Sequence, residues 1–199
     1  MKIIFVGASG DVGQAAFAEL SQRHDVVCIG RKTGDVRADI SDRSVIETMY
    51  GKVGAFDALV SAAGHVHFAP LAEQTDASLK MGLENKVMGQ INLVLAGLKR
   101  LAGKGSFTLT SGVLDRDPVV AGTDAALANG ALAGFVKGAA IEVPPGLRTN
   151  MVSPGLLDVS ERRYGALFPG HERVPSERVE RAFAKCVEGA INGQVVIVE

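Results

Sequence analysis

The stretch of sequence that decides the fold reads Lys2-Ile3-Ile4-Phe5-Val6-Gly7-Ala8-Ser9-Gly10-Asp11-Val12-Gly13. Its apolar run ends at a glycine, as a buried strand does, and the segment from Asp11 to Arg23 carries apolar residues at helical spacing. The three glycines therefore lie between a predicted strand and a predicted helix. This order is typical of the first strand, turn and helix of a doubly wound α/β domain.

Each glycine of this turn has its own physical role. Gly7 permits the tight turn that leaves the strand, Gly10 lets the backbone approach a pyrophosphate, and Gly13 lets the helix pack closely on the sheet. Free amides at the helix N-terminus meet the phosphate charge. A plain glycine turn is the alternative, but strand, spacing and helix all favour a dinucleotide site. Its predicted binding residues are Gly7, Ser9, Gly10, Asp11, Val12 and Gly13.

The rest of the chain alternates strands with helices. Further strands are predicted at Val26–Ile29, Val36–Ile40, Phe56–Ser61, Ser106–Thr110, Leu147–Val152 and Val195–Val198. Helices are predicted at 42–53, 75–102, 123–143 and 175–188, with an irregular loop at 154–171. Because each strand is a nearly continuous apolar run, both faces of the sheet are expected to be covered. The prediction is one Rossmann-like α/β domain over residues 1–199, a doubly wound parallel sheet of about seven strands with helices on both faces.

One connection departs from this scheme. Only six residues, Gly30 to Asp35, separate the second and third predicted strands. A parallel crossover normally needs about a dozen residues or more. This corner of the sheet is therefore expected to be trimmed, without a helix.

Composition limits the function classes. The 199 residues are 47% hydrophobic and 22% charged, which fits a globular domain, and the net charge of −1 gives no electrostatic reason to expect nucleic acid or an anionic membrane as partner. No apolar run approaches about 18 residues and no signal-peptide pattern is seen, so we expect no membrane span and a cytoplasmic location. Cys28 and Cys186 lack paired spacing, and no metal site is predicted.

The end of the second strand bears on cofactor choice. A dinucleotide domain that prefers NAD usually places an acid here for the ribose 2′-hydroxyl, whereas an arginine accommodates a 2′-phosphate. Arg31 and Lys32 occupy this place and no acid precedes Asp35. The pattern favours NADP(H) over NAD(H), with two solvated surface cations as the alternative. Asp39 and Ile40 are predicted to contact the adenine.

Several further segments together resemble the short-chain dehydrogenase/reductase family, and the likeness covers nearly the whole chain. Ala62-Ala63-Gly64 looks like the family's segment beside adenine and ribose, and Pro154-Gly155 like the turn beside the nicotinamide. The strand that ends at Ser111 resembles the one that carries the catalytic serine. The matching segments are 7–13, 38–42, 57–64, 105–112, 150–155 and 193–198.

The resemblance implies hydride transfer between a nicotinamide and a small carbonyl or alcohol substrate. In the family a tyrosine transfers the proton, a lysine four residues later lowers its pKa, a serine fixes the substrate oxygen, and an asparagine on the long helix relays protons. Aligning the helix at Gly130 puts Ala125 at the tyrosine position and Asn129 at the lysine position. Aligning Gly89 puts Lys86 at the asparagine position, so Ser111 alone remains of the four. This member is therefore atypical.

Two hypotheses follow from that departure. In the first, the site is rebuilt with Ser111 and Lys86 as catalytic residues, since a partly buried lysine beside a cofactor can become a usable acid or base. His65, His67 and Tyr164 are further candidates. In the second, catalysis is lost and the domain is an NADP-binding sensor or regulatory protein. A homodimer or homotetramer is also expected, because the helix at 123–143 is rich in Ala and Gly and its equivalent in the family pairs across a two-fold axis.

Overall fold

The structure is a computed structural model that describes residues 1–101 and 103–199. Seven parallel strands form the main sheet in the order β3-β2-β1-β4-β5-β6-β9. Their bounds are β1 Lys2–Val6, β2 Asp25–Gly30, β3 Val36–Arg37, β4 Ala58–Ser61, β5 Gly105–Thr110, β6 Leu147–Pro154 and β9 Val195–Val198. The strand order reverses at β1, so the predicted doubly wound sheet is confirmed, and the C-terminal ends of β1 and β4 mark its switch point.

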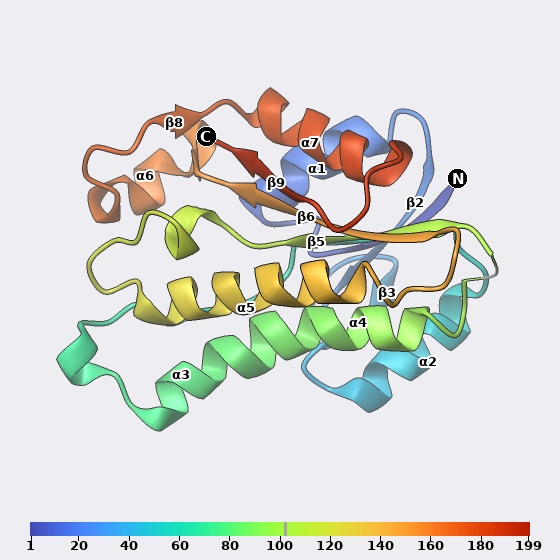
Figure 1. Cartoon of the computed structure of the whole chain (residues 1–199), viewed down its shortest axis with the longest axis horizontal. Coiled ribbons are helices and arrows are strands. Elements are labelled where there is room, and N and C mark those ends of the chain that lie inside the picture. The colour runs from blue at the N-terminus through green and yellow to red at the C-terminus, as the bar shows by residue number, and fades with distance from the viewer. Residues whose placement is uncertain (102) are drawn as a thin grey trace.

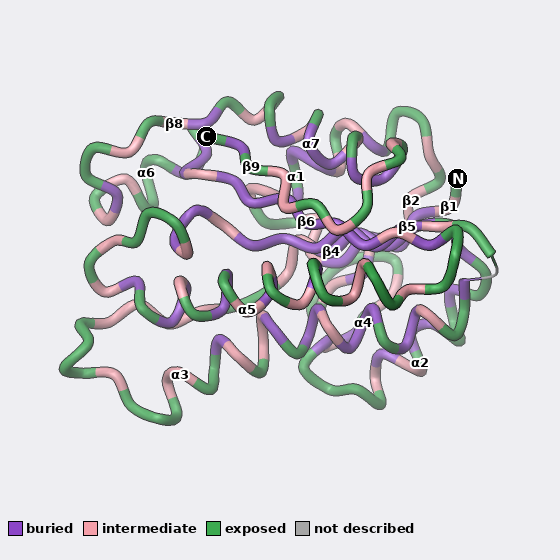
Figure 2. The backbone as a smooth tube through the Cα atoms, in the orientation of Figure 1, coloured by how far each residue is buried: buried purple, intermediate pink, exposed green. Residues whose placement is uncertain are grey.

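Helices cover both faces of the sheet (Figure 1). One face carries α1 (Asp11–Leu20) and α7 (Ser176–Glu188), and the other carries α2 (Arg43–Val53), α4 (Gly89–Gly97) and α5 (Thr123–Ala139). The period of two along β1 divides its side chains between these layers. Ile3 and Phe5 join the core under α1 and α7, while Ile4 and Val6 join the core under α2, α4 and α5. Buried segments accordingly run through the middle of the molecule (Figure 2).

The trimmed corner of the sheet is confirmed. β2 and β3 are parallel neighbours joined by five residues. Asp35 fixes this short connection to β2, because its amide donates to the Cys28 carbonyl (2.8 Å) and its Oδ2 accepts from the Cys28 amide (2.8 Å). Gly34 has a φ of +109°, which favours glycine. The segment at 38–40 continues past β3 without pairing as a strand.

The long helix predicted at 75–102 is in fact three segments. α3 (Asp76–Gly82) leads into a π-helical turn, η2 (Leu83–Met88), and then into α4, which ends at Gly97. Ala102 lies outside the described residues. Thr75 and Ser78 form a capping box at the start of α3. π-helical turns inside helices occur frequently at functional sites, and this one contains Lys86.

Two other predictions need correction. The segment at 154–171 is not an irregular loop: β7 (Leu156–Leu157) pairs with β8 (Arg173–Val174), and η4 (Asp158–Ser160), α6 (Glu161–Tyr164) and η5 (Gly165–Leu167) lie between them. β7 and β8 run parallel, and buried Leu156, Leu157 and Val174 hold this segment on the core. The helices α1 and α5 also end earlier than predicted, at Leu20 and Ala139.

Candidate functional site

The glycine loop fits closely against its neighbours. Gly7 has a φ of +86°, and a Cβ there would lie 2.9 Å from the backbone of Ala62 and Ala63. A Cβ on Gly13 would overlap the Gly7 carbonyl oxygen. Gly10 is the N-cap of α1 and supplies no side-chain cap. The loop therefore depends on glycine for its conformation, and the first-turn amides of α1 have no side-chain acceptor at the cap.

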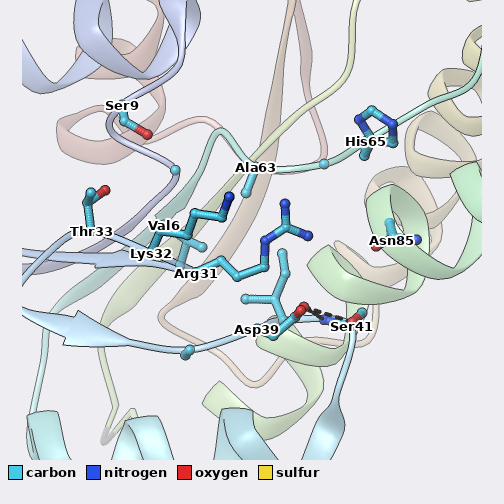
Figure 3. A pocket seen from close by; sticks show the side chains of 15 residues that line it. Val6, Ser9, Arg31, Lys32, Thr33, Asp39, Ser41, Ala63, His65 and Asn85 are labelled. Carbon is cyan, nitrogen blue, oxygen red and sulfur yellow. Dashed lines mark hydrogen bonds between the residues drawn. The ribbon is translucent and has the colours of Figure 1, made fainter.

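Beside this loop lies a cavity of about 370 Å³. Figure 3 shows the side chains of Arg31 and Lys32 beside each other, with Asp39 and Ser41 below Arg31 in this view. Asp39 Oδ1 accepts from the Ser41 hydroxyl (2.7 Å) and amide (3.0 Å). These two hydrogen bonds, with the nearby charge of Arg31, lower the pKa of Asp39. The cavity is lined by Val6, Gly7, Ser9, Gly30, Arg31, Lys32, Thr33, Ala38, Asp39, Ile40, Ser41, Ala63, Gly64, His65 and Asn85.

Only part of the predicted cofactor set lines this cavity. Gly7, Ser9, Arg31, Lys32, Asp39, Ile40, Ala63 and Gly64 do so, whereas Gly10, Asp11, Val12, Gly13, Ala62, Pro154 and Gly155 do not. Val12 packs on the core under α1 and α7. Asp11 Oδ2 accepts a hydrogen bond from buried Ser160 at 2.7 Å, so its carboxylate ties α1 to η4.

Sequence reasoning missed several cavity residues. Thr33 and Ser41 directly adjoin predicted residues, so their position in the chain was a usable signal. Asn85 directly precedes Lys86, and its contribution depends on the π-helical turn, which no pattern in the sequence predicts. His65, a weak catalytic candidate in the sequence, lies on the cavity wall (Figure 3).

Lys86 and Asn129 form the centre of a second polar group. Lys86 Nζ donates to Asn129 Oδ1 at 2.6 Å and to the Ser111 carbonyl at 3.4 Å. The lysine stem passes over Gly64, where a Cβ would lie 2.5 Å from Lys86 Cγ. Lys86 and Asn129, which the alignment by spacing singled out, thus contact each other directly. The cation reaches this place from the π-helical turn, and the amide reaches it from α5.

Ser111 follows β5, with its hydroxyl inside the protein. The residue is 6% exposed, and its Oγ has no hydrogen-bond partner among the described residues. The strand end before it is fixed, because buried Gln90 bonds both the amide and the carbonyl of Thr110 at 2.9 Å. An unpaired buried hydroxyl is costly and is therefore expected to have a partner in some state of the protein.

The environment of Lys86 changes its protonation. Burial lowers the pKa of Lys86 from 10.5 to about 8, against the raising effect of the Asp115 and Asp124 charges. An ammonium group with this pKa is mostly protonated at neutral pH and gives up its proton more readily than a solvated lysine. The arrangement therefore combines a proton donor with an orienting amide and a free hydroxyl.

The remaining candidates lie elsewhere. His67 contributes its backbone amide, which donates to Asp124 Oδ2 at 2.7 Å. Tyr164 is 37% exposed and lies beside the Arg163 guanidinium, 5.7 Å from its ring centre. Within residues 1–101 and 103–199, no cluster of three or more His, Cys, Asp or Glu side chains is placed to bind a metal ion. Nor is any helix in that part of the chain long and apolar enough to cross a membrane.

Comparisons with known proteins agree with this architecture. A family model described as enoyl-(acyl carrier protein) reductase matches residues 1–184. A Streptomyces violaceoruber protein, whose name assigns it as ketoacyl reductase 2 of the granaticin polyketide synthase, is 27% identical over 232 residues, covering 98% of this chain and 93% of that protein.

Solved structures are similar over the whole chain. The protein lin1944 from Listeria innocua is 46% identical with a TM-score of 0.98, and all of both chains is covered. A small-chain dehydrogenase crystallised in complex with NADPH is 25% identical with a TM-score of 0.85, covering 100% of this chain and 96% of that one. The chain therefore belongs to the short-chain dehydrogenase/reductase family of oxidoreductases.

Proposed function

We propose that this protein is an NADP(H)-dependent oxidoreductase that acts on a small carbonyl or alcohol with a non-standard proton-transfer set. One observation carries the proposal: the buried Ser111 hydroxyl has no hydrogen-bond partner among residues 1–101 and 103–199, and the carbonyl of the same residue accepts from Lys86. A module that only binds a nucleotide has no evident need for a free hydroxyl and a cation here. The substrate oxygen would supply the missing partner.

The residues along the cavity fit the cofactor. Gly7 and Gly64 line the cavity at places where a Cβ would overlap neighbouring protein atoms, and Arg31 and Lys32 bring two positive charges suited to a 2′-phosphate. The relative crystallised with NADPH supports the same choice. When bound, the nicotinamide supplies or accepts the hydride. Pro154 and Gly155, at the end of β6, remain proposed contacts by the family resemblance.

The chain's own residues donate and accept the proton that accompanies hydride transfer. In the reducing direction Ser111 Oγ–H donates a hydrogen bond to the substrate carbonyl oxygen and orients it. Lys86 Nζ gives a proton to that oxygen as the carbon is reduced, and the neutral amine then takes a proton from solvent. Asn129 Oδ1, 2.6 Å from Nζ, holds the ammonium in place. In oxidation the same amine accepts the proton.

The second candidate is an NADP-binding sensor or regulatory protein without turnover. Ala125 favours it, because it is 3% exposed and packs in an apolar cluster with Val113, Leu114, Leu156 and Phe168. No proton donor can act from that position. The two functions differ in one measurable property, which is turnover.

A carbonyl panel with NADPH tests the choice. We expect oxidation of NADPH with at least one carbonyl, and a rate reduced at least tenfold by Ser111→Ala and by Lys86→Met. Lys80→Met is the matched control, because Lys80 lies on α3 with its side chain 58% exposed and paired with Asp76. Tight NADPH binding without turnover of any substrate, and without an effect of either variant on binding, supports the sensor instead.

Cofactor preference is tested separately by titration. Arg31→Asp is expected to weaken NADP(H) binding at least tenfold more than NAD(H) binding, because it removes a cation and adds a repelling carboxylate. Arg37→Asp makes the same charge change at an exposed residue of β3 that does not line the cavity. Equal losses for both cofactors, or equal effects of both variants, contradict the 2′-phosphate assignment.

The assembly is proposed to be a homodimer or homotetramer. Exposed apolar side chains on the helical layer support this: Met88 and Leu95 are 43% and 38% exposed, and Leu127 on α5 is 43% exposed. Gly134 and Gly138 of α5 have open space beside them, which suits close helix contact. Light scattering measures the mass, and Leu127→Glu is expected to shift it towards the monomer.

A further inference from the structure

Asp124 is a buried carboxylate that the proposed mechanism does not use. It lies in the first turn of α5 and is 0% exposed. Its Oδ2 accepts from the His67 amide, but its Oδ1 has no hydrogen-bond partner in the described part of the chain. Burying a carboxylate with one oxygen unsatisfied costs free energy unless another interaction compensates. The positive end of the α5 dipole is one such interaction.

The surroundings of Asp124 are shaped to admit it. A Cβ on Gly82, the last residue of α3, would overlap both carboxylate oxygens, so the bare backbone there makes room for the charge. Lys86 follows Gly82 by four residues, within the π-helical turn η2 that continues from α3. Asn129, its hydrogen-bond partner, lies five residues after Asp124 on α5. Gly82 therefore lies against Asp124, and Lys86 contacts Asn129, so both pairs join the same helical run to α5.

We propose that Asp124 is a positioning residue that acts through Lys86: it is a fixed, buried negative charge that favours the ammonium form of the lysine. The effect on activity rests on the proposed function, whereas the charge coupling between the two side chains does not. Asp124 also anchors the loop after β4 through His67. The carboxylate therefore has a hydrogen bond at Oδ2 and none at Oδ1 among the described residues.

Two carboxylates favour the charged form of Lys86. Asp115 of η3 has the larger effect and is itself paired with the Arg116 guanidinium at 3.2 Å, whereas Asp124 has no ion-pair partner among the described residues. His65 and His67 are the titratable residues of the loop that passes Gly64. The described contacts of Asp124 are to neutral backbone, at the His67 amide and at Gly82.

Direct titration of Lys86 tests the coupling. In protein labelled with ¹³C at lysine Cε, the Lys86 resonance is identified by its loss in Lys86→Met, and its pKa is followed by NMR. We expect Asp124→Asn to lower the pKa of Lys86 by at least about half a unit, a threefold change in Ka. The amide keeps an oxygen for the His67 amide. Asp124→Ser, whose hydroxyl suits a helix N-terminus, is the second variant.

The control is Asp76→Asn, which removes an exposed carboxylate from α3. An unchanged Lys86 pKa in folded Asp124→Asn or Asp124→Ser, or an equal change in Asp76→Asn, overturns the inference. The alkaline limb of the pH–rate profile is expected to move to lower pH by the same amount as the pKa. A shifted pKa in a protein without turnover contradicts the proposed function alone, and turnover without the shift contradicts this inference alone.

Discussion

Replacing Lys86 by Met is expected to change how stability depends on pH. Burial lowers the pKa of Lys86 from 10.5 to about 8. The unfolded chain therefore binds more protons than the folded one between pH 8 and 10.5, and stability must rise with pH across this window. Below pH 8 both states are charged, and the cost of burying the charge is fully present. Methionine has a similar length and no charge, so it removes this dependence.

The size of the effect follows from the two pKa values. A pKa lowered by about 2.5 units means that the buried charge destabilises the folded protein by about 3 kcal/mol at neutral pH. About 2.5 kcal/mol of this destabilisation disappears between pH 7 and pH 10. The wild-type protein is thus expected to gain about 2.5 kcal/mol of stability relative to Lys86→Met over that range. With a urea m-value of roughly 2 kcal/mol/M, the difference between the two unfolding midpoints changes by about 1 M.

Urea unfolding of both proteins at pH 7, 8, 9 and 10 measures this difference. The difference in stability between the two proteins also includes the hydrogen bond that Lys86 donates to Asn129. Losing it leaves the Asn129 acceptor unsatisfied, which costs about 1–3 kcal/mol, but this cost does not vary with pH. Other titrating groups are common to both proteins and cancel in the comparison. A midpoint difference that stays constant from pH 7 to pH 10 would refute the argument that Lys86 is buried as a charge.

Two glycine substitutions give further predictions. Gly97→Ala is expected to cost about 1–3 kcal/mol, because its Cβ would lie 2.7 Å from Phe107 Cε1, whereas Gly134→Ala, with nothing within 4 Å, is expected to gain about 0.5–1 kcal/mol from helix propensity. Thermal unfolding measures both, and equal effects contradict the close packing of Gly97. Gly64→Ala is expected to displace the Lys86 stem and to weaken NADPH binding severalfold in a fluorescence titration. Unchanged binding contradicts the placement of Gly64 beside the cofactor.

Much of the fold could be predicted because it follows from local patterns. The apolar runs of β1 and β4 and the glycine turn after Val6 indicate parallel strands and the switch point directly. The six residues predicted to connect the second and third strands, five in the structure, correctly indicated a trimmed corner, since a connection this short excludes a helix. The prediction of an irregular loop at 154–171 was wrong because the elements of this segment are only two to four residues long. Tertiary contacts of Leu156 and Val174, not local propensity, hold them.

The candidate site could be predicted in its parts but not in its connections. Alignment by spacing singled out Lys86, Asn129 and Ser111, yet it could not show that the first two are hydrogen-bonded. That contact depends on the π-helical turn, whose extra backbone residue changes the direction of the side chains after Gly82. Asp124 escaped notice because a carboxylate after a helix start normally indicates a solvated cap. Its burial arises from Gly82, on a distant part of the chain.

The hydrogen bond between Lys86 and Asn129 also bears on how such a site can evolve. Lys86→Asn alone would leave two amides and no cation, while Asn129→Lys alone would bring two ammonium groups within contact of each other, and like charges at that range repel. Each single step is thus worse than either endpoint, which is the pattern geneticists call reciprocal sign epistasis. Lineages carrying the two arrangements would be separated by a fitness valley, and the pair would be inherited as one unit. A sequence search that requires a lysine at position 129 misses this protein, whereas a search that accepts a lysine at either position 86 or position 129 finds it.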